Sequence, residues 1–208
     1  MKTLATSSRA VRFSVPVLFS ILAFGAIAHL AFAVGTITPA TNGTGISIDT
    51  SSSAVSPAWT TLTGPVITES AAGDIALGTH TITLPTGWEF NTAQTIVNST
   101  GGSGEVVLGN NNITPSATTF IFNVTAISST GGATLTFSNV QVRPTGTLSG
   151  TSGNMTHSGA GIVGVDNGST NFGTLSTVAG TVTKLAFTTP PSATTVYGSA
   201  FSQQPVVK

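Results

Sequence analysis

Two histidines, His80 and His157, are the side chains best suited to acid–base chemistry after the first 33 residues. An imidazole has a pKa near neutral pH, so each could move a proton if a partner held it in place. No Gly-x-Ser-x-Gly sequence frames a serine nucleophile. His80 is expected at a strand edge, partly buried against Ile82, and His157 in a solvated glycine-rich loop, 149–161. The sequence therefore predicts a protein that is not an enzyme.

Four acidic residues, Glu69, Asp74, Glu89 and Glu105, lie within 37 residues of one another. Glu69 and Asp74 flank a turn and could approach each other, as the two carboxylates of a glycoside hydrolase must. They could equally share a calcium ion. Calcium takes about six or more oxygen ligands, and few are present nearby, so solvation of a loop is the favoured interpretation.

A second candidate for calcium is the segment 166–171, Asp-Asn-Gly-Ser-Thr-Asn. Its possible metal ligands are Asp166, Asn167 and Asn171, with a hydroxyl and backbone carbonyls around the glycine. The segment lacks the alternation and terminal glutamate of an EF-hand loop. Because Asp-Asn-Gly is also a common hairpin turn, the turn is the competing interpretation. No other cofactor is predicted.

Large aromatic side chains offer a possible carbohydrate site. Trp88 and Trp59 are candidate ligand-binding residues, because flat aromatic rings stack on sugar rings; Tyr197 is a third such ring. Trp88 follows Gly87 at an expected strand edge, where a platform could be exposed. The alternative is burial, since large aromatic residues supply much of a protein core.

The charge of the chain limits its partners. Charged residues make up 6% of the sequence, and the segment after residue 33 holds three basic and six acidic residues. Nucleic acid is therefore not an expected partner, since its binding needs clustered lysine and arginine. Disorder does not fit a chain that is 39% hydrophobic with eleven phenylalanines. The absence of cysteine excludes disulfides and thiolate chemistry.

Residues 1–33 have the layout of a secretory signal peptide. Lys2, Arg9 and Arg12 precede an apolar run, 13–28, and Ala31-Phe32-Ala33 forms a cleavage site of the A-x-A type. The prediction is a signal helix cleaved after Ala33 and an extracellular or cell-surface location. An uncleaved membrane anchor is the alternative, because about 20 apolar residues can span a bilayer.

After the signal peptide, apolar residues alternate with polar ones, and no long segment has a helical period. The clearest strands are 79–84, 120–126 and 133–137, the last two expected to pair as a central hairpin. The alternation shifts at Asn139, which indicates a bulge or bend. Further expected strands are 45–48, 58–62, 66–69, 94–97, 105–108, 162–165 and 173–178. Their spacing predicts an all-β, antiparallel sandwich of jelly-roll or immunoglobulin-like type over residues 34–180.

Part of this region carries a family-like pattern: Val66-Ile67-Thr68-Glu69, Leu84-Pro85 and Gly87-Trp88-Glu89-Phe90. It resembles the cohesin-like and carbohydrate-module-like sandwiches of bacterial surface proteins, in which a strand carrying a glutamate leads to a Leu-Pro-x-Gly-aromatic strand end. The resemblance implies a scaffold or adhesion module and carries over no catalytic residues.

The last segment carries a second pattern: Leu185-Ala186-Phe187, Pro190-Pro191, Tyr197-Gly198-Ser199-Ala200-Phe201 and Gln204-Pro205-Val206-Val207. It resembles the opening of the immunoglobulin-like repeats of long bacterial secreted and surface proteins. The Asp-x-x-Gly-Asn turn that usually follows does not occur, so residues 181–208 are interpreted as the truncated start of such a repeat. An isolated hairpin is marginal in water, so this segment is expected to need further strands or a partner.

These features together predict a non-catalytic, extracellular structural or adhesion module of a larger bacterial surface protein, S-layer-like or an adhesin. The expected partners are neighbouring repeats of the same chain, with cell-surface polysaccharide or self-association as further possibilities. The alternatives are a carbohydrate-binding module and an accessory fragment of a secreted glycoside hydrolase.

Overall fold

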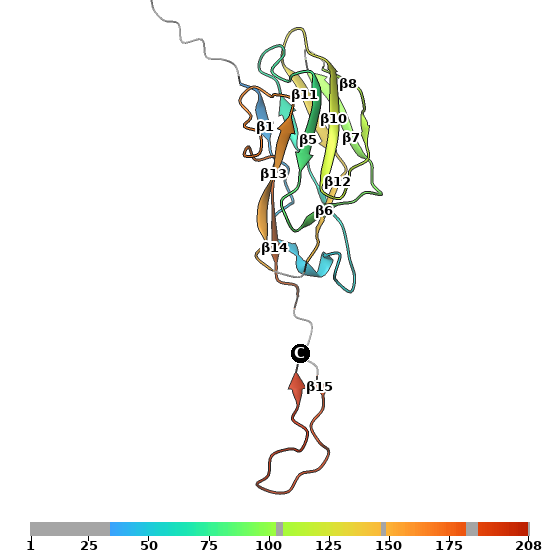
Figure 1. Ribbon diagram of the computed structural model, residues 1–208, viewed down its shortest axis with the longest axis vertical. Helices are drawn as coiled ribbons and strands as arrows, with labels where there is room; N and C mark the ends of the chain where they lie inside the picture. The colour runs from blue at the N-terminus through green and yellow to red at the C-terminus, as the bar shows by residue number, and fades with distance from the viewer. Residues whose placement is uncertain (1–33, 103–105, 147–148, 182–186, 208) are drawn as a thin grey trace, which may run out of the picture. The chain divides into compact units, whose positions relative to one another are not determined.

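The computed structural model describes residues 34–102, 106–146, 149–181 and 187–207 (Figure 1). The chain divides into two units, residues 1–32 and 33–208, and the described residues belong to the second. The predicted signal helix and its cleavage site, residues 1–33, lie outside the described residues, as do Glu105 and Lys184. In the described part of the chain, no helix is both long and apolar enough to cross a membrane.

One layer of the fold is a five-stranded sheet. Its strands, in spatial order, are β1 (Thr36–Thr38), β4 (Val66–Thr68), β11 (Ala133–Ser138), β7 (Ile96–Gly102) and β9 (Asn112–Ile113). A three-stranded sheet has the order β3 (Thr60–Leu62), β12 (Val140–Pro144) and β6 (Trp88–Phe90), and its strands are neighbours in sequence of β4, β11 and β7, respectively. All pairs in both sheets are antiparallel.

The other layer is a six-stranded sheet. Its strands, in spatial order, are β2 (Ile46–Ser47), β14 (Gly173–Val178), β13 (Ser152–Gly159), β5 (Gly78–Thr83), β10 (Thr119–Ala126) and β8 (Val107–Leu108). The pairs are antiparallel except β2 with β14. Figure 1 shows β13, β5 and β10 side by side, and a short 3-10 helix, η1 (Ile48–Thr50), follows β2.

The core forms where the inward side chains of the two layers meet. Phe120 and Phe122 of β10 point inward, and Phe137 of β11 packs between their rings at 5.2 and 5.0 Å. All three are at most 1% exposed, because every second residue of a strand faces the same side. The predicted all-β, antiparallel sandwich is confirmed, with its strands lying between Thr36 and Val178.

The predicted break at Asn139 is also confirmed. Asn139 separates β11 from β12 and has a φ of 63°, while Phe137 and Val140 on either side are both fully buried. Asparagine tolerates this left-handed conformation better than most residues. Its Nδ2 also donates to the Thr95 carbonyl oxygen at 2.8 Å. The extra residue lets β12 keep its apolar side facing the core after the strand bends.

The predicted hairpin between the strands at 120–126 and 133–137 is wrong. β10 pairs with β5 and β8, whereas β11 pairs with β4 and β7, so the chain crosses from one layer to the other between them. A two-residue turn would have forced pairing, but residues 127–132 are long enough to pass over the end of the sandwich. Alternation shows which side of a strand is buried and does not show its neighbour.

Two further local predictions are wrong. The supposed loop at 149–161 contains the eight-residue strand β13, and the segment 162–165 contributes only an isolated bridge between Ile162 and Ile75. Two short strands, β1 and β9, were not predicted as strands, and β6 was expected only as the strand end of the family-like pattern. In β13 the serines at 152 and 158 face outward, while Met155 and His157 face inward and are buried. The other positions on their side, Gly153 and Gly159, carry no side chain, so the strand has only two strong signals of burial.

The C-terminal strands form a sheet of their own. β15 (Phe187–Thr189) and β16 (Val206–Val207) pair with each other in antiparallel fashion and with no strand of the sandwich. Large apolar side chains of this segment are exposed: Phe187, Val196, Tyr197, Phe201 and Val206. Two strands with exposed apolar side chains do not make a core.

Candidate functional site

The two candidate acid–base histidines lie together in the core. His80 comes from β5 and His157 from the neighbouring β13, and both are fully buried. His80 Nδ1 and His157 Nε2 are 3.0 Å apart. The expectations of a strand edge for His80 and a solvated loop for His157 are both wrong, because the two strands pair side by side and turn both imidazoles inward.

Each end of the histidine pair meets an oxygen atom. His80 Nε2 lies 2.9 Å from the Ala76 carbonyl oxygen, and His157 Nδ1 lies 2.8 Å from Oδ1 of Asn167. Aromatic rings cover both imidazoles, with Phe122 stacked on His80 and Phe172 on His157. The pair is thus enclosed by ring faces and bonded at its edges.

Burial decides the charge state of the pair. Desolvation lowers the pKa of His80 below its ordinary value, although its bond to the Ala76 carbonyl acts in the opposite direction. Desolvation also lowers the pKa of His157, and the neighbouring His80 lowers it further. Both imidazoles are therefore neutral at pH 7. A buried pair without access to solvent can support a fold, but it cannot reach a substrate.

The two acidic residues of the predicted turn are also structural. Glu69 and Asp74 are 2% and 5% exposed. Glu69 Oε1 accepts a hydrogen bond from the Ile75 amide at 3.1 Å, and its Oε2 accepts one from the Ser128 hydroxyl. Asp74 Oδ2 accepts from the amides of residues 70 and 71 at 2.9 and 2.8 Å. The carboxylates hold backbone groups of their own loop, so the expected solvation of an exposed loop is wrong.

The segment 166–171 does not turn its candidate ligands toward one point. Asn167 Oδ1 faces His157, while Asn171 Oδ1 accepts a hydrogen bond from the Gly173 amide at 2.7 Å. Asp166 is exposed, and its backbone amide donates to the Thr170 hydroxyl at 2.8 Å. Among the described residues, no group of three or more histidine, aspartate or glutamate side chains is placed to hold a metal ion.

The two tryptophan side chains differ in their exposure to solvent. Trp88 of β6 is 2% exposed and belongs to the core, so it does not present the platform that a sugar would need. Trp59, just before β3, is half-buried. The Arg143 guanidinium lies 4.0 Å from the centre of its ring, and Arg143 Nε donates to Glu89 Oε1 at 2.6 Å. This arginine covers one face of the Trp59 ring and leaves that face unavailable for stacking.

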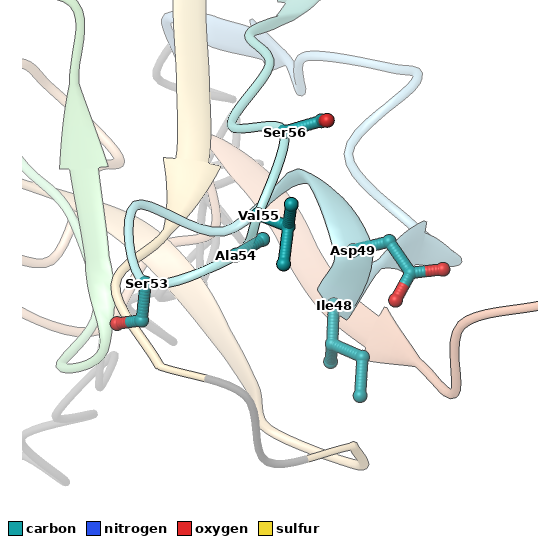
Figure 2. Close-up of a pocket in the computed structure, with 6 residues that line it drawn as sticks. All are labelled: Ile48, Asp49, Ser53, Ala54, Val55 and Ser56. Atoms are coloured by element: carbon teal, nitrogen blue, oxygen red, sulfur yellow. The ribbon is translucent and has the colours of Figure 1, made fainter. Parts of the chain in front are cut away.

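A depression of about 440 Å³ lies beside η1 and the loop that follows it (Figure 2). Its lining residues are Ile48, Asp49, Ser53, Ala54, Val55 and Ser56. Asp49 Oδ2 accepts from the Thr181 amide at 3.1 Å, and a Cβ atom at Gly180 would overlap the same carboxylate. The acid of this depression therefore anchors the chain just after β14, and its lining holds no second titratable side chain.

Two features were missed by sequence reasoning. The stacking of Arg143 on Trp59 joins residues 84 positions apart, and no local pattern indicates it. The histidine pair has a weak signal, since Met155 and His157 share one side of an alternating segment, as His80 and Ile82 do. Nothing in that pattern shows that β5 and β13 are neighbours.

Comparison of the whole chain with protein-family models, with curated proteins and with solved structures found no match.

Proposed function

We propose that this chain is a non-catalytic extracellular module of a larger bacterial surface protein, structural or adhesive in role. The observation that carries the proposal is the placement of its acid–base groups. His80, His157, Glu69 and Asp74 are at most 5% exposed, and each is bonded inside the fold. Catalysis requires a group that touches substrate, whereas these four groups stabilise loops and strands.

The outward side of the six-stranded sheet supports a structural or adhesive role. Every outward residue of β5 is a threonine, namely Thr79, Thr81 and Thr83, and Thr119 and Thr156 continue the row on the neighbouring strands. The strands β5, β10, β13 and β14 carry no lysine, arginine, aspartate or glutamate. Threonine is well suited to an exposed strand surface, and an uncharged surface suits contacts with neutral partners.

The segment 181–208 supports a modular arrangement. Five large apolar side chains are exposed among its described residues, two of them in the strands β15 and β16, and Tyr197 is as exposed as in an extended chain. Exposed apolar surface of this kind marks an interaction site or an incomplete core. This supports its interpretation as the start of an immunoglobulin-like repeat that packs with further strands. The antiparallel sheets of the preceding domain are the support for its interpretation as a cohesin-like or carbohydrate-module-like sandwich.

The test is to detect the native protein with an antibody raised against residues 34–180. The medium, envelope and cytoplasm of the bacterium that encodes the chain are probed separately. The proposal expects a species larger than the 20.7 kDa of this chain in the envelope or medium, sensitive to protease added to intact cells. A species confined to the cytoplasm would contradict it. Retention of the protein on insoluble polysaccharide, lost in Trp59→Ala, would instead favour a carbohydrate-binding module.

A further inference from the structure

The bonds of the histidine pair define how many protons it must hold. The Ala76 carbonyl oxygen can only accept, so His80 Nε2 must carry a proton to bond with it. The contact of 3.0 Å between His80 Nδ1 and His157 Nε2 needs one proton between the two nitrogens. If His157 Nδ1 meets an amide oxygen of Asn167, it needs a proton as well. Three bonds then require three protons.

Two neutral imidazoles supply only two protons. The pair can form all three bonds as placed only with one added proton and a positive charge. The alternative is to turn over the side-chain amide of Asn167, which exchanges its oxygen and nitrogen. Nδ2 would then donate to an unprotonated His157 Nδ1, and the neutral pair would be satisfied.

Turning the Asn167 amide breaks the hydrogen bond that its Nδ2 makes with Gly159. In the orientation with Oδ1 at His157, Asn167 Nδ2 donates to the Gly159 carbonyl oxygen at 3.3 Å. In the opposite orientation, Oδ1 faces that same carbonyl, and two acceptors meet. The bond that ties Asn167 to the end of β13 therefore exists only when His157 holds its second proton.

We propose that His80, His157 and Asn167 form a proton-operated latch, in which one proton taken up by His157 turns the Asn167 amide and ties the 166–171 loop to Gly159. His157 takes the added proton because its Nδ1 faces the turnable amide, while His80 Nδ1 already accepts from His157 Nε2. The pair stays neutral at pH 7, and the latch closes in acid.

The side chains that surround the histidine pair do not change the number of protons that its bonds require. β10 contributes the uncharged Phe122, and the segment before β14 contributes Phe172. The charged groups on the adjacent described segments are Asp74 and Asp166. Asp74 Oδ2 is turned to the amides of residues 70 and 71, and Asp166 is exposed in the turn that carries Asn167. Neither carboxylate is a hydrogen-bond partner of an imidazole among the described residues.

The direct test follows the imidazole nitrogens of the full chain by ¹⁵N NMR between pH 8 and pH 4.5. At pH 8, we expect both histidines to be neutral with the proton on Nε2. On acidification, His157 Nδ1 gains a proton before His80 does, and the Asn167 side-chain amide shifts with the same midpoint. A neutral His157 protonated on Nδ1 would overturn the latch. Unfolding before any proton uptake, or an unchanged Asn167 amide, would also overturn it.

A pair of variants tests the part played by the amide. Asn167→Asp offers only acceptor oxygens and a negative charge at His157 Nδ1, so the pKa of His157 should rise by about 1 to 3. The matched control is Ser169→Asp, which adds the same charge to the same turn at an exposed position. Its effect on the pKa of His157 should be smaller. Equal shifts in the two variants would show a general charge effect and overturn the role of Asn167.

Discussion

The carboxylate of Glu69 shows how one residue can appear catalytic in sequence and be structural in the fold. It is buried at the end of β4 and bonded to the Ile75 amide and the Ser128 hydroxyl. The first bond stays inside its own loop, while the second reaches the segment that crosses between the layers. Burial of a charged group without such partners would cost several kcal/mol, so these bonds are necessary for its placement.

Ser128→Ala is expected to lower the free energy of unfolding by about 1 to 3 kcal/mol, because it removes a charge-assisted bond from a buried carboxylate. Urea denaturation of the two proteins measures this difference. The matched control is Ser129→Ala, at an exposed neighbouring position, which should change stability by less than about 0.5 kcal/mol. Equal effects of the two variants would contradict the structural role of the Glu69–Ser128 bond.

The histidine pair gives the stability of the protein a definite pH dependence. The pKa values of His80 and His157 are lowered in the folded state, mainly by desolvation. Below pH 6.5 the unfolded chain binds more protons than the folded one, so stability is full above about pH 7.5 and falls as the pH decreases. The decrease is at most about 1.4 kcal/mol per pH unit for each histidine.

Urea midpoints of the protein without its signal peptide, measured between pH 8 and pH 5, check this dependence. The two histidines are the only side chains of residues 34–208 with ordinary pKa values between 5 and 8. A stability that increased from pH 7.5 to pH 6 would contradict the direction of both pKa shifts.

At the scale of elements, the connection between β11 and β12 shows how one residue keeps a strand in register with the core. Val140 and Val142 would point toward solvent if the chain continued as a regular strand through Asn139, since side chains alternate with a period of two and Phe137 faces the core. Both valines are fully buried. The positive φ and the bond to the Thr95 carbonyl oxygen together favour asparagine at this position.

Asn139→Ala should therefore lower the free energy of unfolding by about 2 to 3 kcal/mol, from the left-handed backbone conformation and the lost hydrogen bond. Asn139→Gly is the matched comparison, because glycine adopts a positive φ without that backbone cost. It should lose only the smaller contribution of the hydrogen bond. Thermal denaturation of both variants measures the difference, and a glycine variant less stable than the alanine variant would contradict the explanation.

At the scale of the whole molecule, the low charge sets how the protein responds to salt. Within the described residues one ion pair is present, Arg143 with Glu89, and its side chains are about one-fifth exposed. Pairs near the surface contribute little to stability, and salt screens them. Stability must come from the apolar core and from bonds to buried polar groups.

We expect the free energy of unfolding to change by less than about 1 kcal/mol between 0.05 and 0.5 M sodium chloride. The urea midpoint at the two salt concentrations checks this expectation. Arg143→Gln provides the comparison, because it removes the charge and keeps much of the side-chain length. A strong loss of stability in salt that disappeared in this variant would show that the ion pair contributes more than its exposure indicates.

Alternation of apolar residues was enough to predict the all-β sandwich and the bend at Asn139. Alternation is a local property, because each strand must turn one side toward the core whichever strand lies next to it. The same signal failed for the hairpin, since the strands at β10 and β11 lie in different layers. The alternation was also weak in β13, because most residues of that strand are small or polar and few apolar residues mark its buried side.

The sequence by itself determined the fold class, the low charge and the absence of cysteine, because these follow from composition and period. Only the tertiary structure decided that His80 meets His157, that Glu69 reaches Ser128 and that Arg143 covers Trp59. These contacts join residues 59 to 84 positions apart. Their partners depend on which strands pair and which layers face each other, and that choice is made by the packing of the whole core.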